Sequence, residues 1–487
     1  MGFPGIITKL LQRHPVLWQS GVLILMGLIT FWPSLQFDFV NWDDPAYIQH
    51  NDLIKSWSFS NLKGVATEVV TRNYAPITIF SFLIEYTLWG MNPTGYHATN
   101  VLLHVANAIL VFLLLRRVTG SGFVGWLTAA LFLIHPVQIE SVVWISSRKG
   151  LLCSLFMLAS LWVRMKPQPT PRDDAYYFIF LALALFSKAH AIVLPPLVLL
   201  YDLQIRRQPL SQSIPRHIIP AFMALWLLLL TMGAQNTVLG GVRGHMNLGL
   251  LQILAVDVTI LWQYIGMLCC PTRLCVMYDP PTSEIGRQVI VGSFGWAFVA
   301  MGLWRVRKSH PLWILGAFSF LLLLFPMLNF FRITTLMNDR YLYLPSIIVF
   351  AMAASIIERA FRGTAGELAY VLNVIKASVK GCLAAVALAA CFVITHQHLP
   401  VWTNPESLWT QALSQYPDMP ILRIQYALTV YSSGRVDEAL RLMKSALKEC
   451  QPDEQDRERM RGFVSDWTRE LNQTQAVAER STLQDSK

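Results

Sequence analysis

Charged residues are scarce in this chain of 487 residues. Asp, Glu, Lys and Arg together make up 14% of it, and hydrophobic types make up 54%, whereas a soluble globular domain carries about 25% charged residues. This scarcity argues against a cytosolic enzyme. The apolar content also excludes a disordered or collagen-like chain.

Several motifs of soluble catalysts are missing as well. The chain has seven cysteines but no Cys/His cluster with zinc spacing, no GxxxxGK[ST] phosphate loop, and neither HExxH nor GxSxG. We therefore expect no soluble nucleotide-sugar chemistry. Cys269, Cys270 and Cys275 crowd one segment, where a disulfide in an oxidising compartment and separate thiols are equally open alternatives.

The formal net charge is +10, and it is unevenly distributed. Residues 401–487 carry a net charge of −2, so the positive excess lies in the apolar part that precedes them. Basic residues in the short loops of a membrane protein set its orientation. We therefore attribute the excess to membrane topology and expect membrane lipid, not nucleic acid, as the surrounding partner.

Long apolar runs dominate the chain before residue 400. A helix that crosses the hydrocarbon core needs about 20 mostly apolar residues. About eleven segments are candidate transmembrane helices: 15–36, 98–116, 122–139, 149–164, 175–189, 190–204, 217–234, 289–304, 311–331, 341–358 and 377–396. The pattern predicts an all-α polytopic membrane protein.

The loops between these segments predict the orientation. Lys and Arg gather before the first segment and after the second, fourth, sixth, eighth and tenth segments. If the N-terminus lies in the cytoplasm, all these positions face the cytoplasm. The apolar stretch 249–268 would break this alternation, so we expect it to be a re-entrant or surface-lying helix on the outer side. We predict a multi-pass protein of the cell inner membrane with a periplasmic C-terminal part, which would be lumenal in a eukaryote.

The tail has a different pattern. Small residues recur at spacings that fit a tetratricopeptide repeat, whose period is 34 residues: Ala412, Pro417, Ala427, Gly434, Ala439 and Ala446. We predict a transmembrane domain over 1–399, with an outer loop over 38–97, and a tetratricopeptide-like helical domain over 400–487. About one and a half repeats fit, and they either dock an acceptor protein or only cap the domain.

An acidic pair, Asp43-Asp44, follows the first apolar segment. Adjacent carboxylates repel, so one of them can have a raised pKa and act as a base. A carboxylate at a membrane surface can deprotonate a hydroxyl or hold a divalent cation. The alternative is a solvated loop or a helix N-cap, and no complete metal-ligand set can be recognised.

Basic residues also occur on the predicted outer side, against the positive-inside trend. Arg148, Lys149, Lys188 and Arg340 could bind a lipid phosphate, although snorkelling explains many basic residues at the ends of spans. Further polar residues at this boundary are candidates for a substrate pocket: Arg72, Tyr74, His97, His104, His135, Glu140, His190 and Asp339. The two histidines His97 and His104 share a helical face, where packing is the commoner role.

Together these segments resemble the transmembrane and tetratricopeptide-repeat O-mannosyltransferases and their bacterial relatives, which are GT-C glycosyltransferases. The resemblance covers nearly the whole chain. It rests on these motifs: Asn41-Trp42-Asp43-Asp44, Asn73-Tyr74-Ala75-Pro76, His97 with Leu102-Leu103-His104, His135-Pro136 with Glu140, Lys188 with Val193-Leu194-Pro195, and Asp339-Arg340 with Tyr343-Leu344-Pro345. Two positions depart from the family pattern. Gly150 stands where the family has an Asp, and Ala189 stands where the family has Pro or Glu after the Lys that corresponds to Lys188.

The resemblance implies a GT-C-like fold and an inverting transfer of a sugar from a polyprenyl-phosphate donor. The acceptor would be a hydroxyl, on protein Ser or Thr, at the outer face. Asp43 or Asp44 would be the base, and the four basic residues would stabilise the leaving phosphate. Two alternatives remain open, a transporter or flippase of lipid-linked sugars and a noncatalytic envelope scaffold that uses the repeats.

Overall fold

The computed structural model describes residues 14–71, 73–238, 248–330, 335–363, 369–450 and 454–485. Within these ranges the chain is helical, and an isolated bridge between Val70 and Asn73 is the β pairing that it contains. The predicted all-α class is therefore confirmed.

The α-helices are α2 (Pro15–Phe31), α3 (Phe59–Thr67), α4 (Pro76–Trp89), α5 (Pro93–Thr119), α6 (Gly122–Ile134), α7 (Ile139–Val143), α8 (Arg148–Arg164), α9 (Pro171–Ser187), α10 (Leu194–Gln204), α11 (Leu210–Val238), α12 (Leu250–Cys269), α13 (Gly286–Val306), α14 (Pro311–Leu324), α15 (Pro345–Ala360), α16 (Ala369–His398), α17 (Pro405–Gln415), α18 (Pro420–Ser432), α19 (Val436–Glu449) and α20 (Glu454–Asp485).

Proline marks the beginning of many of these helices. It occupies the first position of α2, α4, α5, α9, α14, α15, α17 and α18. Proline suits this position because its missing N–H would have no partner in the first turn, and its ring fixes φ near the helical value. The sequence thus specifies locally where each of these helices begins.

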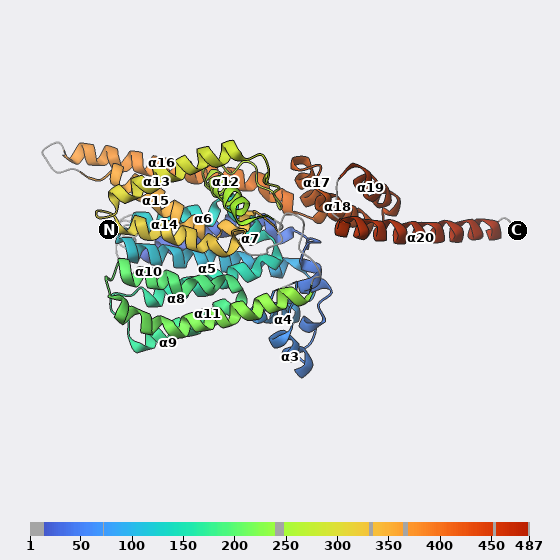
Figure 1. Ribbon diagram of the computed structural model, residues 1–487, viewed down its shortest axis with the longest axis horizontal. Coiled ribbons are helices and arrows are strands. Elements are labelled where there is room, and N and C mark those ends of the chain that lie inside the picture. Colours follow the sequence, from blue (N-terminus) through green and yellow to red (C-terminus); the bar gives the residue numbers. More distant parts are fainter. Residues whose placement is uncertain are drawn as a thin grey trace, which may run out of the picture.

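The long helices run side by side in a bundle, and α17–α20 lie beyond one end of it (Figure 1). Helix α8 packs against α5 and α9, and α6 packs against α5 and α15. Gly120, Gly122 and Gly125 have the spacing GxGxxG, but they join α5 to α6. A Cβ at Gly125 would lie 2.9 Å from the carbonyl oxygen of Phe112, so this glycine permits close helix packing.

Six helices in the described ranges are long and apolar enough to cross a membrane, and α6 with Pro136–Val143 forms a bent pair that would make a seventh. Each of the eleven predicted segments falls on helical structure where it is described. Several of these helices, such as α8 and α9, are shorter than a full span. Helix α12 is one of the six, so the count of about eleven and the surface-lying placement of α12 stay predictions.

The C-terminal helices α17 to α20 stack in chain order, each against the next. Gly434 has a φ of +80° in the turn between α18 and α19, a conformation that glycine adopts without steric cost. Ala427, Ala439 and Ala446 are fully buried between these helices. Small residues thus permit close helix contacts at the predicted positions, and the tetratricopeptide assignment itself and the domain boundary stay predictions.

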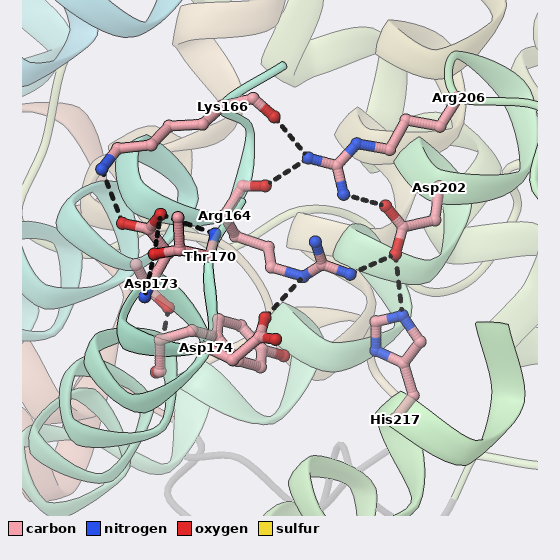
Figure 2. A network of polar contacts seen from close by, with 10 residues as sticks. Arg164, Lys166, Thr170, Asp173, Asp174, Asp202, Arg206 and His217 are labelled. Carbon is pink, nitrogen blue, oxygen red and sulfur yellow. Dashed lines mark hydrogen bonds and ion pairs between the residues drawn. The ribbon is translucent and has the colours of Figure 1, made fainter. Parts of the chain in front are cut away.

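A buried ionic network joins α8, α10 and α11 at the end of the bundle away from α17–α20 (Figures 1 and 2). The Asp202 carboxylate has no exposed surface and accepts hydrogen bonds from Arg164 at 2.8 Å and Arg206 at 2.9 Å. His217 Nε2 lies 3.3 Å from the same carboxylate. Arg206 also donates to the carbonyl oxygens of Arg164, the last residue of α8, and of Lys166, and the last carbonyls of a helix lack partners within the helix.

The network continues towards α9. Lys166 pairs with Asp173 at 2.6 Å, and Asp174 lies 4.0 Å from Arg164. Thr170 and Asp173 form a reciprocal capping box at the beginning of α9. We call this group the inner cluster, after the predicted cytoplasmic side: Arg164, Lys166, Asp173, Asp174, Asp202, Arg206 and His217. Its basic residues, predicted only as loop charges that set orientation, are here held in specific ion pairs.

Candidate active site

The acidic pair lies in the loop that follows α2, and its two carboxylates have different surroundings. Asp44 is buried. One of its oxygens accepts from the Ser146 amide at 3.0 Å and the Ser146 hydroxyl at 2.5 Å, and the other accepts from the Val40 amide at 3.0 Å. Burial raises the pKa of the Asp44 carboxyl to about 6, although these hydrogen bonds favour the charged form. Asp44 therefore ties its own loop to the turn before α8.

Asp43 faces the other way and keeps 25% of its side chain exposed. Its carboxylate accepts a hydrogen bond from the Lys149 ammonium at 3.1 Å. That ammonium lies 4.5 Å from the centre of the Tyr47 ring and 5.6 Å from that of Trp144. Asp43 is thus an accessible carboxylate beside a buried cation.

A small polar pocket lies at the beginning of α8. Lys188 and Arg340 line it from different parts of the chain, together with Ser147, Gly150 and His190. The Lys188 ammonium has no hydrogen bond or ion pair within the residues that the structure describes. The first turn of α8 also contributes residues to the wall, and a helix N-terminus carries a partial positive charge.

Arg340 reaches this pocket from the turn Asp339–Leu342 (η9). Its guanidinium pairs with Glu140, and its amide donates to the same carboxylate at 2.9 Å. Asp339 accepts a hydrogen bond of 2.5 Å from the Tyr278 hydroxyl. Burial and the nearby Glu140 carboxylate raise the pKa of Asp339 above its ordinary value. We call the following residues the outer cluster: Asp43, Asp44, Glu140, Lys149, Lys188, Asp339 and Arg340.

Arg148 is not part of this cluster, although its neighbour Lys149 is. The Arg148 side chain has no exposed surface and donates to Glu85 at 2.6 Å, to the Tyr96 carbonyl at 2.8 Å and to Asn100. All three acceptors belong to α4 and α5. Arg148 therefore joins α8 to these helices and does not line the pocket.

The other predicted pocket residues lie in packed surroundings, except Arg72, which falls outside the described residues. Tyr74 donates to the Ala66 carbonyl at 2.8 Å, and His97 is buried edge-on to the Phe37 ring. The His104 ring nitrogens bridge Tyr343 and the Leu133 carbonyl. The His135 nitrogens contact the Leu268 carbonyl and the Val137 amide. His104 and His135 therefore bridge separate segments of the bundle, and none of the three histidines lines the polar pocket.

No group of three or more His, Cys, Asp or Glu side chains in the described ranges is placed to hold a metal ion. The seven cysteines are all free thiols, and Cys269 and Cys270 are exposed. Of the two alternatives for the segment with three cysteines, the structure has separate thiols.

A larger, apolar cavity of about 340 Å³ adjoins the polar pocket, and Leu344 lines both. Its walls come from α5, α8, α10, α14 and α15, and they include Leu158, Leu197 and Ile347. His310 and Arg359 line it as well, near the predicted cytoplasmic boundary. The cavity therefore follows α15, whose 16 residues span about 24 Å.

Sequence reasoning missed the partners that orient the predicted residues. Ser146 holds Asp44, Glu85 neutralises Arg148, and Tyr278 binds Asp339. Glu85 had a visible signal, because an acid within an apolar helix is a functional or structural candidate by default. Ser146 and Tyr278 had none, since nothing in their neighbourhood along the sequence indicates a distant partner.

The described residues form an all-helical membrane protein. The accessible Asp43 carboxylate and the polar pocket lie at one end of its helix bundle. No protein-family model matches the chain. The chain is 32% identical over 167 residues to the protein O-mannosyl-transferase TMTC4 of Mus musculus. This alignment covers 30% of this chain and 22% of that protein. It is 24% identical over 369 residues to the protein O-mannosyl-transferase F38B6.6 of Caenorhabditis elegans. This alignment covers 67% of this chain and 49% of that protein.

The motif-based resemblance to the transmembrane and tetratricopeptide-repeat O-mannosyltransferases is therefore confirmed. The matched regions span about a fifth to a half of these relatives. Among solved structures, the archaeal oligosaccharyltransferase AglB from Archaeoglobus fulgidus, in complex with an inhibitory peptide and a dolichol-phosphate, aligns with a TM-score of 0.48 at 12% identity. This alignment covers 83% of this chain and 58% of AglB.

Proposed function

We propose that the chain is a membrane glycosyltransferase that moves a sugar from a polyprenyl-phosphate donor to an acceptor hydroxyl, on protein Ser or Thr. The relatives that it matches in sequence are named protein O-mannosyl-transferases. The observation that carries the proposal is the outer cluster. It combines an accessible carboxylate, Asp43, with a polar pocket whose Lys188 ammonium has no acidic partner in the described residues.

Asp43 is the general base in this proposal. The oxygens of Asp44 are already engaged by Ser146 and Val40, so Asp44 fixes the loop and Asp43 faces the acceptor. Asp43 takes the proton of the hydroxyl while that oxygen attacks the anomeric carbon. The bond between the anomeric carbon and the phosphate oxygen breaks, and the lipid phosphate leaves with the electron pair. A single displacement of this kind inverts the anomeric configuration.

Lys188 and Arg340 stabilise the leaving phosphate. An anion is favoured in this pocket because a cation without an acidic partner and the N-terminal turn of α8 both border it. Lys149 contacts the base Asp43 and does not line this pocket. Arg148 has no role in phosphate binding here, because Glu85, Asn100 and Tyr96 occupy its donors.

The apolar cavity supports a lipid as the carrier of the sugar. It begins at Leu344, where the polar pocket ends, and is lined mainly by aliphatic side chains. A polyprenyl chain in this cavity would place its phosphate at Lys188 and Arg340. The transfer then takes place at the outer face of the inner membrane, with the N-terminus cytoplasmic and α17–α20 in the periplasm, where they face the acceptor.

The test compares two substitutions of the same type in the same outer loop. Asp43→Asn removes the base. Asp52→Asn changes a carboxylate that, among the described residues, pairs with Lys55 alone and whose side chain is 91% exposed. Both variants are reconstituted with a polyprenyl-phosphate sugar and acceptor protein, and the acceptor is analysed by intact mass. We expect Asp43→Asn to lower transfer about 10³-fold and Asp52→Asn to retain it. Equal transfer by wild type and Asp43→Asn would refute the proposed base.

The same reconstitution distinguishes a transporter of lipid-linked sugars. A transporter would move the donor across the vesicle membrane and leave the acceptor mass unchanged. A noncatalytic scaffold would bind the acceptor and change neither. Donor translocation and acceptor mass are therefore measured in the same vesicles.

A further inference from the structure

The C-terminal helices contact the loop that carries Asp43. Asn41 lies two residues before Asp43, and its amide group is held from both sides by this domain. Trp409 of α17 donates its indole N–H to the Asn41 oxygen at 2.5 Å. The Asn41 amide nitrogen donates to the Thr429 hydroxyl of α18 at 2.8 Å.

These contacts are buried and are supported by neighbours. Trp409 is fully buried, and Thr429 is 6% exposed. The Trp42 ring packs on Trp409 with centroids 5.3 Å apart, and the Asp38 amide donates to the Thr403 carbonyl at 2.9 Å. Trp409 also belongs to the same hydrophobic core as Val40 in the outer loop. The loop and helix α17 are therefore packed as one unit.

Helix α17 and the residue after it also contact the segment that holds Leu274 and Tyr278. Gln411 and Gln415 donate to the Leu274 carbonyl at 3.0 and 3.2 Å. The Tyr416 ring packs edge-on against Tyr278, whose hydroxyl binds Asp339 next to Arg340. Helix α17 therefore contacts the segment before the proposed base directly, and it is linked to Asp339 and Arg340 only through Tyr278.

We propose that α17 and α18 position the catalytic loop, and that Asn41 is the positioning residue through which Trp409 and Thr429 fix Asp43. The proposal rests on the function proposed above and gives the C-terminal domain a role besides acceptor docking or capping. A small displacement of a catalytic group lowers a rate steeply, by up to about a hundredfold per ångström. Loss of the two hydrogen bonds to Asn41 therefore reduces turnover without changing the donor pocket.

The test uses substitutions that remove hydrogen bonding and retain an apolar side chain. Trp409→Phe keeps an aromatic ring but loses the indole N–H, and Thr429→Val keeps the volume but loses the hydroxyl. The control is Tyr431→Phe, which removes a hydrogen bond to Glu470 in the same domain, away from the loop. We expect the double variant to have a kcat at least tenfold lower, while KM for the lipid donor and binding of polyprenyl phosphate, measured on the folded fraction, stay near wild type. Tyr431→Phe retains the wild-type kcat.

A second measurement does not depend on catalysis. Hydrogen exchange of the backbone amides over residues 38–44 is expected to be about tenfold faster in the double variant and unchanged in Tyr431→Phe. If the wild type transfers sugar and the double variant matches it in both kcat and exchange, the positioning role is wrong. If the wild type transfers no sugar, the proposed function fails, while the exchange data still decide whether α17 and α18 hold the loop.

The single variants keep the test decisive if the double variant does not fold. Thr429→Ser retains the hydroxyl that accepts from Asn41 and donates to the Gln425 carbonyl, whereas Thr429→Val loses both. We expect Thr429→Ser to keep most of the wild-type kcat and Thr429→Val to lose about tenfold. Equal kcat values for these two variants would contradict the positioning role.

Discussion

The two ends of helix α8 carry charged clusters of opposite character. At its C-terminal end, each of the three carboxylates and three non-histidine cations of the inner cluster has an ion-pair partner within that cluster. At its N-terminal end, the outer cluster leaves the Lys188 ammonium without an acidic partner in the described residues and Asp43 partly exposed. Mutually paired buried charges hold helices together, whereas unpaired and accessible charges are available to a substrate. The comparison separates a structural site from a candidate catalytic one.

The largest expected effect is the loss of Asp202 from the inner cluster. Asp202→Asn leaves Arg164 and Arg206 buried without their shared carboxylate, and removal of one partner of a buried ion pair costs about 3–5 kcal/mol. We expect a marked fall in the Tm of the detergent-solubilised protein and an unchanged specific activity of the folded fraction. Asp43→Asn should do the reverse, with wild-type Tm and lost activity. A wild-type Tm for Asp202→Asn would contradict the structural role of the inner cluster.

Lys188 is the next strongest test, because it is the proposed phosphate ligand without a competing acid. Lys188→Met is expected to lower kcat/KM for the lipid donor about 10²-fold, the usual cost of losing one electrostatic contact to a developing anion. Weaker binding of polyprenyl phosphate, measured by displacement of a fluorescent analogue, should accompany it. The matched change in the inner cluster is Lys166→Met, which removes a partly exposed ion pair and should leave both measurements unchanged. Equal effects of the two substitutions would remove the distinction between the clusters.

Asp44 gives a smaller, pH-dependent effect. Burial raises the pKa of its carboxyl to about 6, so the carboxylate becomes protonated as the pH falls through this value. Protonation weakens its hydrogen bonds from Val40 and Ser146, which hold the loop of Asp43. We expect kcat/KM to rise with pH through about pH 6 and to fall by up to tenfold per pH unit below it. In Asp44→Asn this limb near pH 6 should be absent, and its persistence there would assign it to another group.

The smallest effect is expected at the edge of the inner cluster. Asp174 lies 4.0 Å from Arg164, and its side chain is 48% exposed. An ion pair with an exposed partner contributes about 0.5 kcal/mol or less, so Asp174→Asn should leave Tm within about 1 °C of wild type. A loss comparable to that of Asp202→Asn would show that the network acts as an inseparable unit. Thermal unfolding of both variants in the same detergent gives the comparison.

The helical class and the positions of the helices could be predicted from apolar runs, because these patterns are local. The apolar run placed one segment at 98–116, for example, and helix α5 contains it while beginning earlier, at Pro93. The partners of charged residues could not be predicted in this way. Arg148 and Lys149 are adjacent, but consecutive residues of a helix point about 100° apart. One therefore faces Glu85 of α4 and the other faces Asp43.

Long-range pairs explain the remaining differences. Asp202 and Arg164 are 38 residues apart, and Asn41 and Thr429 are 388 apart. Neither residue of such a pair carries a local signal of its partner. The motifs could thus indicate which residues gather at the outer face, but only the packing of α4, α5 and α17 decides which of them stay free.

Helix α8 carries residues of the outer cluster at one end and residues of the inner cluster at the other. Its 17 residues hold Lys149 and Arg164 at a fixed separation of about 23 Å and at a fixed rotation about the helix axis. An insertion or deletion of one residue between them would turn one end by about 100° relative to the other. The outer pocket and the inner ion pairs could not then form in the same molecule. The length of α8 is therefore a constraint on how this chain can vary, and an insertion or deletion within it should disrupt one of the two clusters.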